Sequence, residues 1–216
     1  MNLIKKEGYE IYQRYFIEGY PEEKHIILSD DGYGKDDYIE TESKLVLVTG
    51  SASNSGKMST CLGQIYMDSL KGLNSSYAKY ETFPIWNLPL EHPVNLAYEA
   101  ATADIGDRNV LDLYHENEYG KQAVNYNRDL NAFKIVKSLT KFLPKDNITV
   151  QYKSPTDMGI SNAGECITDD EIVSIAGLLE IRRRMIWYNQ MYNGKKSWVT
   201  ICEELEEDAL KYIYKK

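Results

Sequence analysis

LVLVTGSASNSGKMST, residues 45–60, is the strongest structural signal in this chain. Its first five residues are apolar or β-branched without polar alternation, which predicts a strand covered on both faces of a parallel sheet. A loop of small residues follows, and Gly56-Lys57 begins a predicted helix over 57–71. This order is typical of a phosphate-binding loop, in which backbone N–H groups and the helix N-terminus hold the anion.

The loop offers candidate ligands for ATP and Mg²⁺. Lys57 is the first candidate catalytic residue, because a cation at a helix N-terminus is unfavourable unless an anion lies beside it. Ser59 and Thr60 are candidate magnesium ligands, since Met58 occupies the position where Ser or Thr usually holds the metal. The alternative is a small-residue turn that only begins a helix, because the glycine spacing is one residue longer than in the standard motif. The candidate phosphate-binding residues are Gly50, Ser53, Asn54, Ser55, Gly56, Lys57, Ser59, Thr60 and Arg128.

Glu81 is the second candidate catalytic residue and a third candidate magnesium ligand. It ends a predicted strand, 77–82, one βα step after the loop, and an acidic residue at such an edge can hold Mg²⁺ or orient water. Lys79 alternates with Glu81 and points to the same side, which leaves a binding edge or a plain ion pair open. The polar blocks 125–129 and 154–159 are either ligand contacts or ordinary caps and turns.

The expected fold class is α/β. A small, mostly parallel P-loop-like sheet is predicted in residues 1–90, with further strands at 14–17 and 25–29. A mainly helical portion is predicted in 91–216. About four short strands make a sheet smaller than the average of five or six. The chain is therefore expected to be a piece of a larger protein or to complete its sheet with a partner.

The helical portion contains several predicted helices and one capping signal. Helices are predicted at 95–103, around 130–143 and at 197–214. Residues 168–171 read TDDE, a capping box with Thr168 as the N-cap and Glu171 at N3. The helix that follows is predicted to run to about residue 192, with its apolar face formed by Ile172, Ile175, Leu179 and Ile186.

Charge and composition restrict the partners. The 25 Lys and Arg against 33 Asp and Glu give a net charge of −8, which argues against nucleic acid and favours a small phosphate ligand held locally. No apolar run is long enough for a membrane helix, and the N-terminus lacks a signal-peptide pattern, so a cytoplasmic location is expected. His92, His115 and Cys166 lack metal-site spacing. A homo-oligomer remains open.

Several long blocks resemble the bacterial family catalogued as domain of unknown function 1846. The resemblance implies a protein about twice this length, of which this chain is the middle portion, and it assigns no activity because that family is uncharacterised. The loop is also similar to that of dethiobiotin-synthetase-type P-loop proteins, which share its glycine spacing; this is an analogy only. The blocks are IEGYP (17–21), SDDGYGK (29–35), SGKMSTCL (55–62), YAKYETFPIWNLPL (77–90), HPVNLAYEAATAD (92–104), AVNYNRD (123–129) and YKSPTDMG (152–159).

Three functional hypotheses follow from the sequence. The first is an ATP-dependent transferase, ligase or hydrolase acting on a small molecule. The second is a phosphate- or nucleotide-binding module without catalysis, since Met58 replaces the magnesium-binding hydroxyl. The third is a structural or assembly module of a larger protein.

Overall fold

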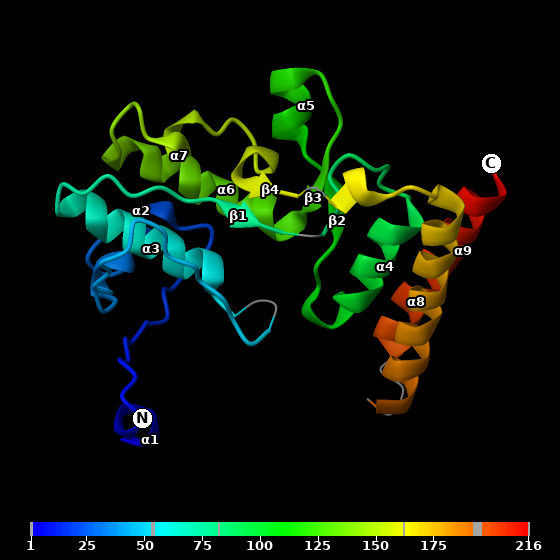
Figure 1. Ribbon diagram of the computed structural model, residues 1–216, viewed down its shortest axis with the longest axis horizontal. Helices are drawn as coiled ribbons and strands as arrows, with labels where there is room; N and C mark the ends of the chain where they lie inside the picture. Colours follow the sequence, from blue (N-terminus) through cyan, green and yellow to red (C-terminus); the bar gives the residue numbers. More distant parts are fainter. Residues whose placement is uncertain (1, 53–54, 82, 162, 192–195, 216) are drawn as a thin grey trace. The chain divides into compact units, whose positions relative to one another are not determined.

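The structure is a computed structural model that describes residues 2–52, 55–81, 83–161, 163–191 and 196–215 (Figure 1). The chain folds as two compact units. The first unit comprises residues 1–77 and 131–151, and the second comprises 78–130 and 152–216.

The described residues form mostly helices with four short strands. Short 3₁₀ turns at residues 33–35, 103–105, 140–142, 156–158 and 163–166 connect them. The elements are α1 (Asn2–Lys6), α2 (Lys24–Ile27), α3 (Lys57–Leu70), β1 (Lys79–Tyr80), α4 (Pro93–Ala101), β2 (Asn109–Leu111), α5 (Leu113–Tyr119), β3 (Val124–Tyr126), α6 (Asn127–Leu139), α7 (Ile148–Gln151), β4 (Gly159–Ile160), α8 (Asp170–Met191) and α9 (Lys196–Tyr214).

The first unit is built around α3. Leu62 is fully buried, and Tyr66 packs edge-on against Phe142, with ring centroids 5.3 Å apart. Tyr33, also fully buried, contacts Tyr66 from the other side at 6.3 Å. Burying these large side chains removes much apolar surface from water, which stabilises the helix in a unit without strands among its described residues.

The second unit contains two two-stranded sheets. Strands β1 and β4 pair in parallel, with Lys79 opposite Gly159 and Tyr80 opposite Ile160. Strands β2 and β3 pair antiparallel, with Asn109 opposite Tyr126. This pairing joins segments about 80 positions apart in the sequence. Because the two strands run in parallel, their carboxyl ends lie at the same edge of the sheet.

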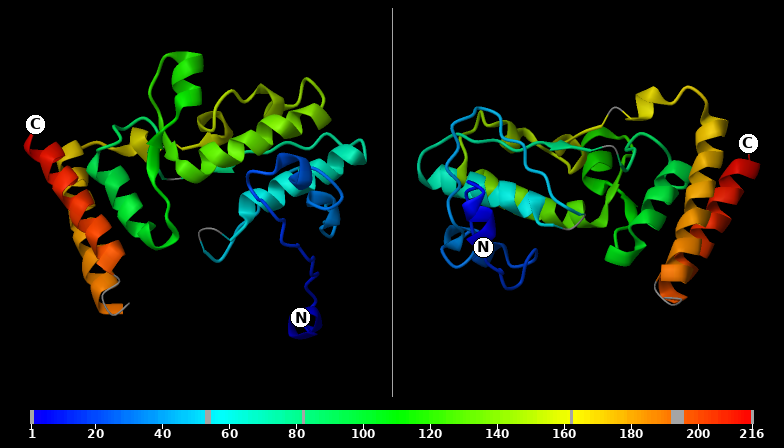
Figure 2. Two further views of the ribbon diagram at one scale, coloured as in Figure 1. Left: turned by 180° about the vertical axis from the view of Figure 1, so that it is seen from behind. Right: turned by 60° about the horizontal axis from the view of Figure 1, so that its bottom comes forward.

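Helices α4, α8 and α9 form a bundle in the second unit, in which α8 and α9 run antiparallel (Figure 2). Gly177 lies where α8 approaches the start of α4, and a β-carbon there would lie 2.6 Å from the Pro93 carbonyl. The Tyr188 hydroxyl donates to the Ala100 carbonyl oxygen at 3.0 Å. The buried core of the bundle is formed by Leu96, Ala97, Ala100, Ala103, Leu178, Ile181, Tyr188, Cys202, Leu205 and Ala209.

His92 has a structural role in this bundle. Its Nδ1 accepts a hydrogen bond from the Val94 N–H at 3.2 Å and so caps α4. Its Nε2 lies 2.9 Å from Oδ1 of Asp170, at the start of α8. Because Nδ1 accepts, the ring proton is on Nε2 and is donated to Asp170. The buried imidazole therefore links two helix N-termini.

The strand predicted at 45–49 is not formed. These residues are neither helical nor paired, and Leu45 and Leu47 are 77% and 85% exposed. An apolar run becomes a strand only when other strands pair with it and cover it, and no described segment does so. The strand prediction at this position was wrong for the structure described.

The other strand predictions in the N-terminal portion also fail, with one exception. Residues 14–17 pair with no strand, and most of 25–29 lies in α2. Only 79–80, within the predicted strand 77–82, forms one, and its parallel partner is β4. The α/β class holds in the form of helices with small sheets, but a P-loop-like parallel sheet is absent from the described residues of 1–90.

The helix predictions are confirmed, with two corrections in α8. Helices α3, α4, α6, α8 and α9 lie where periodicity placed them. However, the capping side chain of α8 is Asp169, whose Oδ1 accepts from the Ile172 N–H at 3.1 Å, one residue after the predicted Thr168. The predicted apolar face is also exposed, since α8 buries Leu178 and Ile181 instead. The residues of that exposed face are Ile172, Ile175, Leu179 and Ile186.

Among the described helices, none has the length and apolar character that a bilayer span needs.

Candidate functional site

The most developed site lies at the shared carboxyl edge of β1 and β4 in the second unit. Glu81 directly follows β1, and Ser161 directly follows β4. Because Tyr80 is paired with Ile160, these two following residues leave the sheet next to each other. The carboxyl edge of parallel strands is where α/β proteins place their ligands.

Lys79 is a buried cation between two carboxylates. Its Nζ lies 2.6 Å from Oε1 of Glu81 and donates a second, short hydrogen bond to Asp129, in the first turn of α6. The Lys79 and Asp129 side chains are only 12% and 10% exposed, whereas that of Glu81 is 31% exposed. The ammonium also faces the ring of Tyr126, at 5.4 Å from the centroid. The prediction that Lys79 and Glu81 point to the same side is confirmed.

The burial of this trio shifts its proton equilibria. Burial raises the pKa of Glu81; the adjacent Lys79 ammonium opposes this rise, and Asp129 adds to it. The pKa of Lys79 is raised because its two carboxylate partners outweigh its burial. Lys79 therefore stays charged, and Glu81 takes up a proton at a higher pH than a solvated glutamate does.

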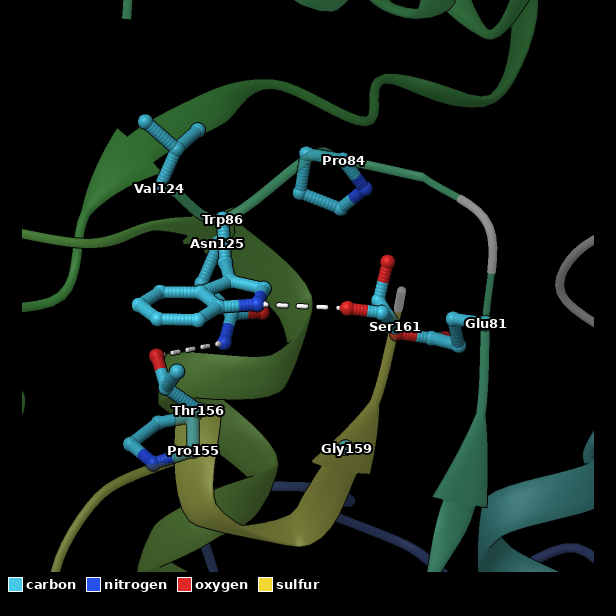
Figure 3. Close-up of a pocket in the computed structure, with 9 residues that line it drawn as sticks. All are labelled: Glu81, Pro84, Trp86, Val124, Asn125, Pro155, Thr156, Gly159 and Ser161. Carbon is cyan, nitrogen blue, oxygen red and sulfur yellow. Dashed lines mark hydrogen bonds between the residues drawn. The ribbon is translucent and has the colours of Figure 1, made fainter. Parts of the chain in front are cut away.

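A small pocket with a mixed lining of polar and apolar side chains opens beside Glu81 (Figure 3). Trp86 forms one wall, and its Nε1 donates to the Ser161 carbonyl oxygen at 3.4 Å. The Asn125 amide donates to Thr156 Oγ1, also at 3.4 Å. The Ser161 hydroxyl is buried and has no hydrogen-bond partner among the described residues. The pocket, with a cavity volume of about 30 Å³, has room for a water-sized group.

Two anchors hold the walls of this pocket. The Asp112 carboxylate, fully buried, accepts from both the N–H (3.0 Å) and the hydroxyl (2.7 Å) of Thr156. Asn95, in α4, binds the backbone of Ile85, accepting from its N–H at 2.8 Å and donating to its carbonyl at 3.1 Å. Saturated buried hydrogen bonds of this kind fix the pocket in one geometry.

Glu81 also lines an aromatic hollow with a volume of about 330 Å³. Phe83 and Tyr98 stack with ring centroids 5.7 Å apart, and Tyr98 lies 5.2 Å from Tyr126. Burial, with the nearby Glu81, raises the pKa of Tyr126, so its hydroxyl stays protonated and able to donate. Tyr80, 85% exposed, completes the lining.

Arg128, predicted to contact phosphate, is paired within the second unit. Its Nη2 lies 2.7 Å from Oδ2 of Asp107, a carboxylate 1% exposed. The other oxygen of Asp107, Oδ1, has no partner among the described residues. The Arg128 side chain is 40% exposed, so one end of its guanidinium neutralises a buried acid while the rest faces solvent.

The predicted phosphate loop lies in the first unit, and Ser53 and Asn54 fall outside the described residues. The Lys57 ammonium turns back onto the loop, donating to the Ala52 carbonyl at 3.0 Å and to the Ser55 hydroxyl at 3.3 Å. Gly56 is the N-cap of α3 with φ +83°, a conformation that glycine adopts readily, and no side chain caps the helix. Gly50 lies so close to Ser55 that a β-carbon would lie 2.1 Å from its Oγ.

The hydroxyls of the two predicted magnesium ligands in the first unit have partners within that unit. The Thr60 hydroxyl donates to the Gly56 carbonyl of its own helix at 3.0 Å, and the Ser59 hydroxyl lies 3.4 Å from Arg14 Nη2. Glu81 belongs to the other unit. Among the described residues, no group of three or more His, Cys, Asp or Glu side chains is arranged to hold a metal ion.

Sequence reasoning found the charged part of the site and missed its aromatic part. Glu81, Lys79 and the polar blocks containing Asp129 and Thr156 were candidates from their positions. Phe83, Trp86, Tyr98 and Tyr126 were not, because aromatic side chains in apolar runs usually indicate core. The signal that could have pointed to them was the concentration of Phe83 and Trp86 directly after Glu81, with Tyr98 in the following helix and Tyr126 inside the polar block 125–129.

Comparison with known proteins identifies the family of this chain. A sequence model of the family described as "Domain of unknown function DUF1846, N-terminal" matches residues 1–208. The chain belongs to this family. The match covers nearly all of the chain, which corrects the expectation that it corresponds only to a middle portion. The family is uncharacterised, so membership assigns no activity.

Three relatives, each named "UPF0371 protein", illustrate the family. The protein of Corynebacterium aurimucosum is 51% identical over 181 residues, which cover 84% of this chain and 36% of the relative. Those of Streptococcus pneumoniae and Streptococcus thermophilus are 46% and 45% identical over 213 and 212 residues, covering 98% of this chain and 41% of each relative. The chain thus spans less than half the length of the curated relatives it matches.

Proposed function

We propose that the Glu81 site binds a small, hydroxyl-bearing ring compound and that Glu81 transfers a proton to or from it. The observation that carries this proposal is the position of Glu81: it lines both the small mixed pocket and the aromatic hollow, at the carboxyl edge of two parallel strands. A titratable group in a concave, mostly apolar lining with a few polar side chains is typical of a small-molecule site.

The charges near Glu81 favour an uncharged or cationic ligand. With both carboxylates ionised, Lys79, Glu81 and Asp129 together carry a net charge of −1, and Arg128 is already paired with Asp107. An anion beside Glu81 would meet repulsion with no free cation of this cluster to balance it. Hydroxyl groups, by contrast, could bond to Glu81, Ser161 and Asn125.

The aromatic hollow supports a ring as the bulk of the ligand. Its volume of about 330 Å³ falls at the lower end of the range for ligand pockets. Exposed aromatic faces such as that of Tyr80 offer stacking surface to a sugar or nucleoside ring.

Proton transfer follows from the environment of Glu81. Its raised pKa brings the carboxyl nearer to neutral pH, where a general acid or base works best. Lys79 orients it, because their ion pair fixes one carboxylate oxygen of Glu81. A positioned group of this kind contributes about 10²- to 10⁴-fold to a rate.

A binding screen tests the proposal. Sugars and nucleosides are titrated into the chain at millimolar concentration, and thermal unfolding is followed, since a ligand that binds only the folded state raises Tm. A compound that raises Tm is expected to bind at least about tenfold more weakly to Glu81→Gln. The matched control is Glu91→Gln, an exposed glutamate of the same unit, which should bind as the wild type does. Equal binding by both variants would contradict the proposal.

Phosphate binding at residues 55–57 is a second candidate, favoured by one observation. Among the described residues, no side chain caps the N-terminus of α3, and the partners of Lys57, in its first turn, are atoms of the loop. An anion could replace the Ala52 carbonyl and the Ser55 hydroxyl as partner of the ammonium. The largest ligand proposed for this site is ATP with Mg²⁺.

Titration with inorganic phosphate and with ATP plus Mg²⁺ tests this second candidate. Lys57→Ala should abolish any rise in Tm, and Lys44→Ala, an exposed lysine of the same unit, should leave it intact. A rise that survives Lys57→Ala, or no rise at millimolar nucleotide, would remove this candidate.

A further inference from the structure

The apolar run at 45–48 is exposed in the first unit, although its sequence is that of a buried strand. Leu45, Val46, Leu47 and Val48 are 77%, 51%, 85% and 39% exposed. Consecutive residues of a strand face opposite sides, so these side chains would require cover on both faces. Isolated exposed apolar residues are common, but four in a row are not.

The backbone of this run is also free. Residues 45–49 form no helix or strand, and their N–H and C=O groups make no backbone hydrogen bond to another described residue. The segment therefore presents two open hydrogen-bonding edges as well as two apolar faces. An open edge of this kind is a template for pairing with another strand.

We propose that residues 45–49 form an inner strand of a sheet whose other strands come from the part of the family's chain that lies outside the matched region. An occupant made of strands is required, because only strands satisfy both edges of the backbone while covering both faces. The relatives have the necessary length, since the matched region is only 41% of the proteins of Streptococcus pneumoniae and Streptococcus thermophilus.

Amide hydrogen exchange in this chain and in a full-length relative tests the proposal. In the 216-residue chain, the amides of 45–49 should exchange at close to the rate of an unfolded peptide. In the full-length Streptococcus pneumoniae relative, the aligned amides should exchange at least about 100-fold more slowly, because sheet hydrogen bonds protect them. Rapid exchange in both proteins would overturn the proposal.

A lysine substitution with a matched control gives a second, independent readout. Leu73, 50% exposed in the turn after α3, is the control for Leu47. In this chain, Leu47→Lys and Leu73→Lys should each leave Tm within about 1 °C. In the full-length relative, lysine at the position aligned with Leu47 should lower Tm by about 5 °C or more, and lysine aligned with Leu73 should not. Equal effects at both positions would overturn the proposal.

A second copy of this chain is the alternative partner for residues 45–49, and the oligomeric state in solution tests it. Under the proposal, the mass of the 216-residue chain in solution stays that of a monomer as concentration increases. A concentration-dependent dimer that Leu47→Lys abolishes and Leu73→Lys retains would assign the strand to self-association and overturn the proposal.

Discussion

Lys79 Nζ lies 2.6 Å from Oε1 of Glu81 and also donates to Asp129, so one ammonium serves two carboxylates. This arrangement joins β1 to the first turn of α6 and gives Glu81 its orientation. Removing the ammonium would leave two carboxylates, one of them 10% exposed, without a counter-charge. The trio is therefore a structural element of the second unit as well as the centre of the candidate site.

The pH dependence of stability should reveal the raised pKa of Glu81. The folded chain holds the Glu81 proton more tightly than the unfolded chain, in which the pKa is near its ordinary 4.5. The wild type should therefore lose free energy of unfolding, relative to Glu81→Gln, as pH rises from about 4.5 toward the folded-state pKa. Denaturant titrations at half-unit pH intervals measure this difference.

The same titrations with Glu91→Gln provide the control, because that side chain is exposed. Its profile should run parallel to that of the wild type. A Glu81→Gln profile that is also parallel to the wild type would show that burial does not shift Glu81.

Substitutions at two adjacent residues, Thr168 and Asp169, should show which of them caps α8. Asp169→Ala should lower the free energy of unfolding by about 0.5–2 kcal/mol, because the Ile172 N–H loses the Asp169 carboxylate. Thr168→Ala should change it by less than about 0.5 kcal/mol. Chemical denaturation of both variants measures the two values, and the reverse order would restore the capping box read from the sequence.

The two faces of α8 should differ in their contribution to stability. Ile181→Ala removes a side chain that is fully buried in the bundle core and should cost about 2–5 kcal/mol. Ile186→Ala, at a position 56% exposed, should lower the free energy of unfolding by less than about 0.5 kcal/mol. The higher helix propensity of alanine offsets part of this loss. Comparable losses in denaturant midpoints would mean that the exposed face is covered in solution.

The three cysteines should react in a fixed order with a thiol reagent. Cys166 is exposed, whereas burial raises the pKa of Cys61 and brings that of Cys202 to about 11. Because the thiolate is the reactive form, labelling at pH 8 should modify Cys166 first and Cys202 last. Mass spectrometry of peptides at successive times measures the order; early labelling of Cys202 would show that the α8–α9 core opens readily.

The sequence alone determined the longer helices α3, α4, α6, α8 and α9, whereas it missed α5 and predicted a strand over most of α2. The 3.6-residue apolar period, Pro93 at the start of α4 and Pro144 after α6 depend on interactions within one turn or two, which any fold must respect. It also identified Glu81 and Lys79 as a same-side pair, because alternation along a strand is a local property.

Only the tertiary structure decided the strand pairings and the exposed faces. A strand is stabilised by neighbours distant in sequence: 79–80 finds β4, whereas the more apolar 45–49 finds no partner among the described residues. The buried side of α8 was likewise set by α4 and α9, since apolar and polar residues are mixed around this helix and define no single apolar face. The pocket beside Glu81 depends on Ser161 and Trp86, which come together only through the β1–β4 pairing and the Trp86–Ser161 hydrogen bond.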